Sequence, residues 1–129
     1  DKTAPVIGQR IAANNNFMVL RYADVLLMLT EATGDAQYLN LVRKRAGLPE
    51  FGTASYPAAK YPTVELATEH ERRVELAFEF QRWFDLKRTN RALTVLAGKG
   101  KAVTQNKLLI PIPNVVRDQN GKIAQNVGY

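Results

Sequence analysis

The sequence predicts an all-α fold, in which helical hairpins are followed by a loop-rich, partly extended carboxy-terminal segment. Three observations lead to this prediction. Apolar residues recur at helical spacing in several stretches between residues 17 and 96. Glycine or proline stands where the first two stretches end, at Gly34, Gly47 and Pro49. Beyond residue 97, glycines and prolines recur, and both residue types interrupt helices.

The composition is typical of one soluble globular domain. A chain of 129 residues can bury one modest core, and a charged share of 23% argues against disorder along most of its length. We therefore expect a single unit over residues 1–129. It begins with an extended lead-in at 1–16, continues as helices over 17–96, and ends in a loop and extended tail at 97–129.

The residue counts exclude several kinds of site. The chain has no cysteine and one histidine, which excludes disulfides, thiolate or multi-histidine metal sites and cysteine nucleophiles, and we expect no metal and no cofactor. The net charge of +6 is spread among carboxylates, so we expect no nucleic-acid partner. The longest apolar stretch, 17–29, contains Arg21 and Asp24 and is shorter than the roughly 20 residues that a membrane span needs.

The first helix is expected to run from residue 17 or 19 to about residue 32. Apolar side chains lie on almost every side of it, which is typical of a helix covered by neighbours. One stripe at helical spacing differs from the rest. It comprises Arg21, Asp24, Met28 and Glu31.

A second helix is expected to form a tight hairpin with the first. Asp35 is a suitable N-cap after the break at Gly34, and Gly47 is a left-handed stop after Ala46. The expected inner face comprises Ala36, Leu39, Val42 and Ala46. The last turn is basic, where cations suit the helix dipole, and we interpret it as a solvated face rather than a nucleic-acid patch: Arg43, Lys44 and Arg45.

Residues 48–62 are expected to form a loop, because Pro57 and Pro62 prevent a helix from continuing through them. The loop carries the aromatic residues Phe51, Tyr56 and Tyr61. These rings could present flat faces to a sugar or a protein partner. We favour the interpretation that they fold back on the core.

The stretch HERRVELAFEFQRWFDLKR, residues 70–88, is expected to form a third helix. Its carboxylates, Glu71, Glu75 and Glu79, fall on one stripe and need cations nearby. Four pairs have the required i,i+3 spacing: Arg72–Glu75, Glu79–Arg82, Arg82–Asp85 and Asp85–Arg88. Apolar residues occupy most other directions, so the helix is expected to be wedged between neighbours: Val74, Leu76, Ala77, Phe78, Phe80, Trp83, Phe84 and Leu86.

This density of charge is interpreted as structural, and no catalytic residue is predicted. Carboxylates held by fixed arginines are poor at proton transfer near neutral pH. His70 is expected to form a hydrogen bond at the start of the helix, and Trp83 is interpreted as a core residue rather than a sugar-stacking one. Arg21 and Asp24 of the first helix are expected to pair with the Glu and Arg residues of the third, and so to hold the helices in one register.

The tail is expected to be irregular. Gly98-Lys99-Gly100-Lys101 reads as a solvated, mobile loop, and residues 108–113 are kept extended by two prolines. Asn120-Gly121 is a turn signal that could join two short strands.

Four motifs, in this order, resemble the carboxy-terminal part of the RagB/SusD family. They are LRYADVLLM at 20–28, LNLVRKRAGL at 39–48, the combination of HERR at 70–73 with ELAFE at 75–79 and RWFDLKR at 82–88, and LIPIP at 109–113 with the closing QNVGY at 125–129. Where that family commonly has a glycine, this chain has Phe80, which favours a more continuous helix.

The resemblance implies a surface-exposed lipoprotein of the outer membrane with tetratricopeptide-like helical hairpins. Such a protein binds glycans or other nutrients together with a TonB-dependent, SusC-like transporter and is not an enzyme. Family members are several times longer, so we expect this chain to be a carboxy-terminal fragment whose lipid anchor lies outside it. Which residues contact the ligand is left unassigned, as is the identity of the glycan. The alternative is a helical scaffold for protein–protein interaction without its own glycan site.

Overall fold

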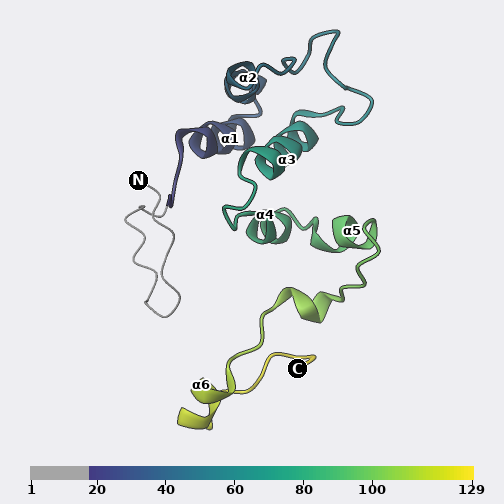
Figure 1. Cartoon of the computed structure of the whole chain (residues 1–129). Coiled ribbons are helices and arrows are strands. Elements are labelled where there is room, and N and C mark those ends of the chain that lie inside the picture. The colour runs from purple at the N-terminus through teal and green to yellow at the C-terminus, as the bar shows by residue number, and fades with distance from the viewer. Residues whose placement is uncertain (1–17) are drawn as a thin grey trace, which may run out of the picture. The chain divides into compact units, whose positions relative to one another are not determined.

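A computed structural model describes residues 18–129 of the chain, so the predicted lead-in at 1–16 lies outside the described residues. Residues 18–129 form six α-helices and one 3-10 helix, with no strand among them (Figure 1). The all-α prediction is therefore confirmed. These residues belong to two compact units, one ending at Glu75 and the other running from Leu76 to Tyr129. The expectation of a single unit over 1–129 stays a prediction.

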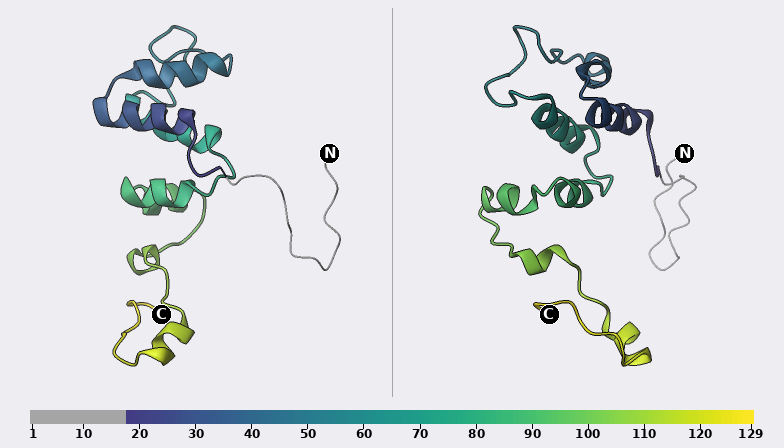
Figure 2. Two further views of the ribbon diagram at one scale, coloured as in Figure 1. Left: turned by 90° about the vertical axis from the view of Figure 1, so that its left-hand side faces the viewer. Right: turned by 180° about the vertical axis from the view of Figure 1, so that it is seen from behind.

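The first unit contains α1 (Tyr22–Thr33), α2 (Ala36–Arg45) and α3 (Val64–Glu75). Helix α1 packs against both other helices, and Figure 2 shows this three-helix cluster from two further directions. Helices α1 and α2 form the predicted tetratricopeptide-like hairpin. The chain reverses at Gly34, where φ is 71°, and Asp35 then accepts a 2.8 Å hydrogen bond from the backbone N–H of Gln37. Both capping predictions are confirmed.

Helix α1 begins later than the sequence predicted. Arg21 has extended backbone angles, φ −123° and ψ 154°, so the first helical residue is Tyr22. The extended backbone places Arg21 where its guanidinium reaches α3, as described below. At the other end of the hairpin, Gly47 has φ 69° and stops α2 as predicted.

The core of the first unit lies between the hairpin, the loop and α3. Its buried apolar members are Ala23, Leu26, Leu27, Leu39, Val42, Tyr56 and Ala67. The loop after α2 contributes to it directly, because the ring of Tyr56 is buried and meets Phe51 edge-on at 5.0 Å between centroids. Tyr61 packs against the same cluster. The prediction that the loop aromatics fold back on the core is confirmed.

The predicted third helix over 70–88 is wrong in its bounds. Helix α3 starts at Val64 and ends at Glu75, a turn follows, and α4 (Arg82–Arg88) begins after it. Within this turn Phe78 has φ 67° and Phe80 has φ 61°. A right-handed helix cannot pass through left-handed residues, so Phe80 marks a break and not a more continuous helix.

The apolar residues around this break are not wedged between neighbours as predicted. The side chains of Phe78 and Phe80 are 98% and 79% exposed, and Val74 and Phe84 are exposed too. Only part of the predicted apolar surface is covered, because the break turns Leu76 inward and the phenylalanines outward; Leu76 and Leu86 are buried. Trp83, interpreted as a core residue, is half-buried.

The second unit contains α4, α5 (Ala92–Ala97), the 3-10 helix η1 (Gln105–Leu108) and α6 (Asn114–Gln119). Helices α4 and α5 pack together across a tight turn at Asn90, where φ is 56°. The predicted short strands around Asn120-Gly121 are wrong for the described residues, because α6 leads directly into that turn.

Side chains of the last residues hold the tail in place. Gln125 accepts a 2.8 Å hydrogen bond from the N–H of Ile112 and donates a 3.0 Å bond to the same residue's carbonyl. Asn126 donates to the carbonyl of Ile110 at 2.7 Å, and the Tyr129 hydroxyl donates to that of Leu109 at 2.9 Å. The Ile-Pro segment and the closing residues therefore lie side by side.

Candidate functional site

The charged residues at the α2–α3 contact form the first group to consider as a site. Arg43 Nη1 donates to Glu71 Oε2 at 2.6 Å, and Arg43 Nε donates to the carbonyl of Pro49 at 2.6 Å. The guanidinium also lies 5.0 Å from the centre of the Tyr56 ring. The prediction of a solvated basic face is wrong for Arg43, because α3 supplies a carboxylate that draws this side chain into the interior.

A second set of ion pairs joins α1 to α3. Arg72 Nη1 lies 2.6 Å from Asp24 Oδ1, and both side chains are buried. Arg21 donates to Glu75 twice, at 2.9 Å to the carboxylate and at 2.7 Å to the backbone carbonyl. The other carboxylate oxygen of Glu75 lies 2.6 Å from Arg45 Nη2. The prediction that Arg21 and Asp24 pair with the third helix is confirmed.

These contacts are structural. Glu71 is fully enclosed and Glu75 is bonded from two sides, so no substrate can reach either carboxylate without breaking the helix contacts. Of the four predicted i,i+3 pairs, Asp85–Arg88 is confirmed, with Arg88 Nη2 at 2.8 Å from Asp85 Oδ1. The partners described above for Arg72 and Glu75 come from α1, from the residue before it and from α2. Spacing along one helix cannot reveal such partners.

His70 lies within α3, so its predicted place at the start of a helix is wrong. Its ring stacks on Tyr61, with 4.1 Å between centroids and 16° between planes, which ties the loop to the helix. The described part of the chain contains no group of three or more His, Asp or Glu side chains that could hold a metal ion. It likewise contains no helix long and apolar enough to cross a bilayer.

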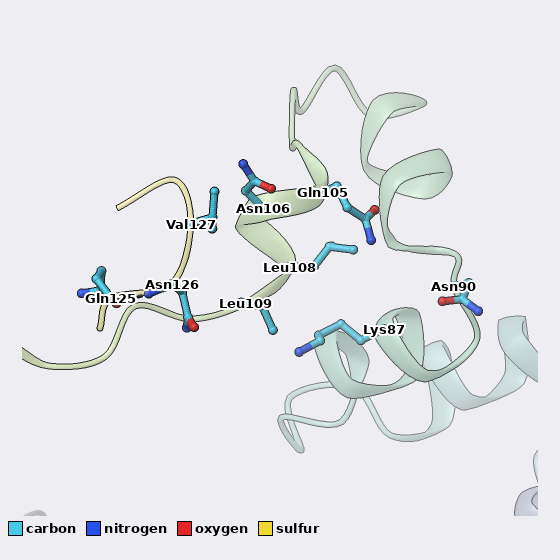
Figure 3. A pocket seen from close by; sticks show the side chains of 9 residues that line it. All are labelled: Lys87, Asn90, Gln105, Asn106, Leu108, Leu109, Gln125, Asn126 and Val127. Atoms are coloured by element: carbon cyan, nitrogen blue, oxygen red, sulfur yellow. Dashed lines mark hydrogen bonds between the residues drawn. The ribbon is translucent and has the colours of Figure 1, made fainter. Parts of the chain in front are cut away.

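A pocket in the second unit is the strongest candidate for ligand binding. It has a volume of about 590 Å³, within the range of small-molecule sites. Its lining, drawn in Figure 3, consists of Lys87, Asn90, Gln105, Asn106, Leu108, Leu109, Gln125, Asn126 and Val127. We call it the amide pocket. Five of the nine residues carry carboxamides, and none is acidic.

Each wall of the amide pocket comes from a different element. Helix α4 supplies Lys87, and the left-handed turn after it supplies Asn90, whose N–H donates to the Lys87 carbonyl at 3.1 Å. The 3-10 helix supplies Gln105 and Asn106. The tail supplies Gln125 and Asn126, whose amides are engaged with the backbone at residues 110–112.

The polar groups of the amide pocket therefore divide into two sets. Gln125 and Asn126 are used to hold the tail, whereas the side chains of Lys87, Asn90, Gln105 and Asn106 form no hydrogen bond or ion pair with the described residues. Carboxamides offer both donors and acceptors, and leucines offer an apolar face. This combination suits a polyhydroxylated ligand, whose hydroxyls and C–H faces need both.

Sequence reasoning missed the amide pocket. Its residues span positions 87 to 127, and only the return of the tail brings them together. The available signal was the recurrence of Gln-Asn dipeptides in the tail, at 105–106, 119–120 and 125–126, of which the first and the last line the pocket.

A second cleft, of about 500 Å³, lies on the first unit between α1 and α2. It is lined by Arg21, Tyr22, Ala23, Leu26, Leu41, Val42 and Arg45. The cleft is mostly apolar, and its two arginines are bonded to Glu75. It offers fewer hydrogen-bonding groups to a sugar than the amide pocket does.

Comparison with known proteins assigns the chain to a family. A sequence model of the SusD family matches residues 2–129. The chain belongs to the SusD family. This confirms the resemblance drawn from the four motifs. Two SusD-like relatives come from Formosa agariphila: "SusD-like protein P2" is 32% identical over 91% of this chain, and "SusD-like protein P38" is 32% identical over 90% of it.

The SusD-family chain spans about a quarter of each of these relatives, 26% of the first and 25% of the second. No solved structure gave a significant match. In the motif resemblance described above, Phe80 stands where the family commonly has glycine, and its φ is 61°. A left-handed backbone is what glycine accommodates at least cost, so the structure gives a physical reason for that glycine.

Proposed function

We propose that this chain is part of a glycan-binding component of nutrient import, at the outer-membrane surface, that works with a TonB-dependent, SusC-like transporter. The observation that carries the proposal is the SusD-family match over residues 2–129. The SusD-like relatives support it. The buried carboxylates are ion-paired with arginines of neighbouring helices, which also fits a binding protein better than an enzyme.

The amide pocket is the part of the structure that best supports sugar binding. Asn90, Gln105 and Asn106 present carboxamides that have no partner among residues 18–129 and can bond to hydroxyls. Leu108 and Leu109 add apolar surface within the same pocket. The side chains come from short elements whose ends are fixed by backbone hydrogen bonds, so binding requires little ordering of the walls.

Titration calorimetry of the full chain against a panel of neutral and charged oligosaccharides tests the proposal. We expect saturable binding of at least one class, and weaker binding by the double variant Gln105→Ala/Asn106→Ala. The double variant Gln37→Ala/Asn40→Ala is the control. It also replaces one Gln and one Asn, but in the first unit and outside the pocket, and so accounts for the loss of two carboxamides. Asn40 accepts a hydrogen bond from the backbone N–H of Phe51, so the folding of this control variant is checked by circular dichroism.

Absence of binding to every member of the panel would contradict a glycan site in this chain. Capture of the transporter by immobilised chain, from detergent-solubilised outer membranes, tests the proposed partnership separately. We expect the SusC-like protein to be retained by the chain and not by a resin without it.

A scaffold without its own glycan site is the second candidate, and the exposed phenylalanines favour it. Phe78, Phe80 and Phe84 are all exposed on the turn after α3 and on the first part of α4. Exposed apolar groups of this kind mark protein contacts in many soluble proteins. Capture of the transporter together with no glycan binding would support the scaffold over the glycan-binding component.

A further inference from the structure

We propose that the amide pocket selects an anionic sugar unit, a uronate or a sulfate ester, by pairing its negative group with Lys87. This rests on the proposed function, because it names the class of glycan for the pocket already described. Lys87 lines the pocket, and none of the lining residues carries a negative charge.

Within the described residues, the arrangement of α4 leaves the ammonium of Lys87 without a carboxylate. The acidic residue of that helix, Asp85, is bonded to Arg88 through two nitrogens, at 3.0 Å and 2.8 Å. Lys87 itself has no hydrogen bond or ion pair with the described residues. A half-buried cation facing a pocket without acids favours an anion there.

A second cation, Lys107, is adjacent in sequence to two residues that line the pocket. Lys107 lies between two lining residues of η1, and its Nζ donates to the carbonyl of Gly128 at 2.8 Å while lying 3.6 Å from the centre of the Tyr129 ring. These partners are neutral, so the charge of Lys107 is not cancelled by them. Lys107 does not itself line the pocket, so it adds positive potential nearby but no direct contact.

The remaining groups are placed to recognise the rest of the sugar. Figure 3 shows Lys87 on α4 and Gln105 on η1, two different elements, with Leu108 drawn between them in this view. The carboxamides of Asn90, Gln105 and Asn106 can bond ring hydroxyls, and the leucines can contact a C–H face. A neutral glycan would use the amides and leave the ammonium of Lys87 without a partner.

Binding constants of the full chain for three sets of oligosaccharides test the inference: oligogalacturonates, which carry carboxylates; carrageenan oligosaccharides, which carry sulfates; and maltooligosaccharides, which are neutral. We expect one or both anionic sets to bind more tightly than the neutral set. Lys87→Met keeps most of the side-chain length and removes the charge. It should weaken anionic binding about tenfold, the effect of one charge-assisted hydrogen bond, and leave neutral binding unchanged.

Two control variants separate the role of Lys87 from the loss of any positive charge. Lys99→Met removes a charge from an exposed position outside the pocket and should leave every binding constant unchanged. Lys87→Arg keeps the charge and should retain most of the anionic affinity. Added salt should weaken anionic binding by the wild-type chain more steeply than by Lys87→Met.

The outcomes distinguish this inference from the proposed function. Binding of neutral glycans only, or anionic binding that is unchanged in Lys87→Met, overturns the selection of an anion while glycan binding stands. No binding of any set by the folded wild-type chain overturns both. Preference for one anionic set over the other identifies the negative group as carboxylate or sulfate.

Discussion

Arg43 of α2 and Glu71 of α3 form an ion pair at 2.6 Å, with side chains only 6% and 3% exposed. Two opposite charges are thereby joined inside the first unit, next to the ring of Tyr56. Such a pair adds little stability compared with well-packed apolar residues, but removing one partner leaves the other charge stranded. It therefore specifies how α2 and α3 meet.

Arg43→Ala should destabilise the chain by roughly 3–5 kcal/mol, because Glu71 keeps a buried and unpaired carboxylate. Arg45→Ala is the matched control: Arg45 lies on the same helix and also pairs with α3, but its side chain is 60% exposed. It should cost about 1 kcal/mol or less. Urea unfolding followed by circular dichroism measures both. Equal losses in the two variants would contradict the role assigned to Arg43.

Arg72→Ala should lower stability far more than Arg73→Ala. Arg72 is buried and bonded to Asp24 of α1 at 2.6 Å, whereas its neighbour Arg73 is exposed. A double-mutant cycle with Asp24→Asn should give a coupling free energy of about 1–3 kcal/mol between positions 24 and 72. Additive losses in the cycle would show that the α1–α3 register does not depend on this pair.

Phe80→Gly should stabilise the chain by about 1 kcal/mol. Phe80 holds a left-handed backbone that costs a non-glycine residue about that much, and its exposed ring gives up little buried surface. Phe84→Gly is the control, since Phe84 is the same residue type and is also exposed but lies within α4, where glycine costs about 1 kcal/mol. Thermal melts should thus move in opposite directions. A lower melting temperature for Phe80→Gly would mean that its ring makes a stabilising contact.

Stability should fall in alkaline solution because of Tyr56. Burial raises the pKa of the Tyr56 hydroxyl above its ordinary value of about 10, an effect that the nearby Arg43 partly opposes. The unfolded chain therefore loses this proton at lower pH than the folded chain does. The contribution of Tyr56 to the free energy of unfolding is complete below the pKa that its hydroxyl has in the unfolded chain. It is lost as the pH rises through the pKa that the hydroxyl has in the folded chain. Denaturant unfolding at a series of pH values, with an ultraviolet titration of tyrosine, measures this.

Tyr56→Phe is the control for that pH dependence. The variant should lose part of the alkaline decline, because it has no hydroxyl to ionise at this position. At neutral pH it should be at least as stable as the wild type, since the buried Tyr56 hydroxyl has no hydrogen-bond partner within the described residues. An unchanged alkaline decline in Tyr56→Phe would assign it to other groups.

Several features of the first unit were predictable from the sequence because they depend on residues close together in the chain. Asp35 caps α2 and Gly47 ends it through bonds to residues within the same turn. The pairing of Arg21 and Asp24 with α3 was also predictable in kind, because charges on a mostly apolar helix need partners. Which arginine meets which carboxylate was not predictable from spacing, as the pairing of Arg72 with Asp24 shows.

The break after Glu75 and the amide pocket were not predictable in the same way. Residues 70–88 have the composition of one helix, and the left-handed backbone at Phe78 and Phe80 is a local conformation that their side chains disfavour. The pocket depends on Gln125 and Asn126 bonding to the backbone at residues 110–112. Both segments belong to a motif of the family, but the motif does not state that they contact each other.

The sequence by itself determined the helical class, the hairpin with its caps, the inward turn of the loop aromatics and membership in the SusD family. Each of these depends on residues close together in the chain or on the order of the motifs. Only the tertiary structure decided that Arg43 is buried, that the helix breaks before α4, and that Lys87 faces a pocket lined with carboxamides. The physical reason is that burial and charge pairing depend on which distant segments meet, and that choice belongs to the packed chain as a whole.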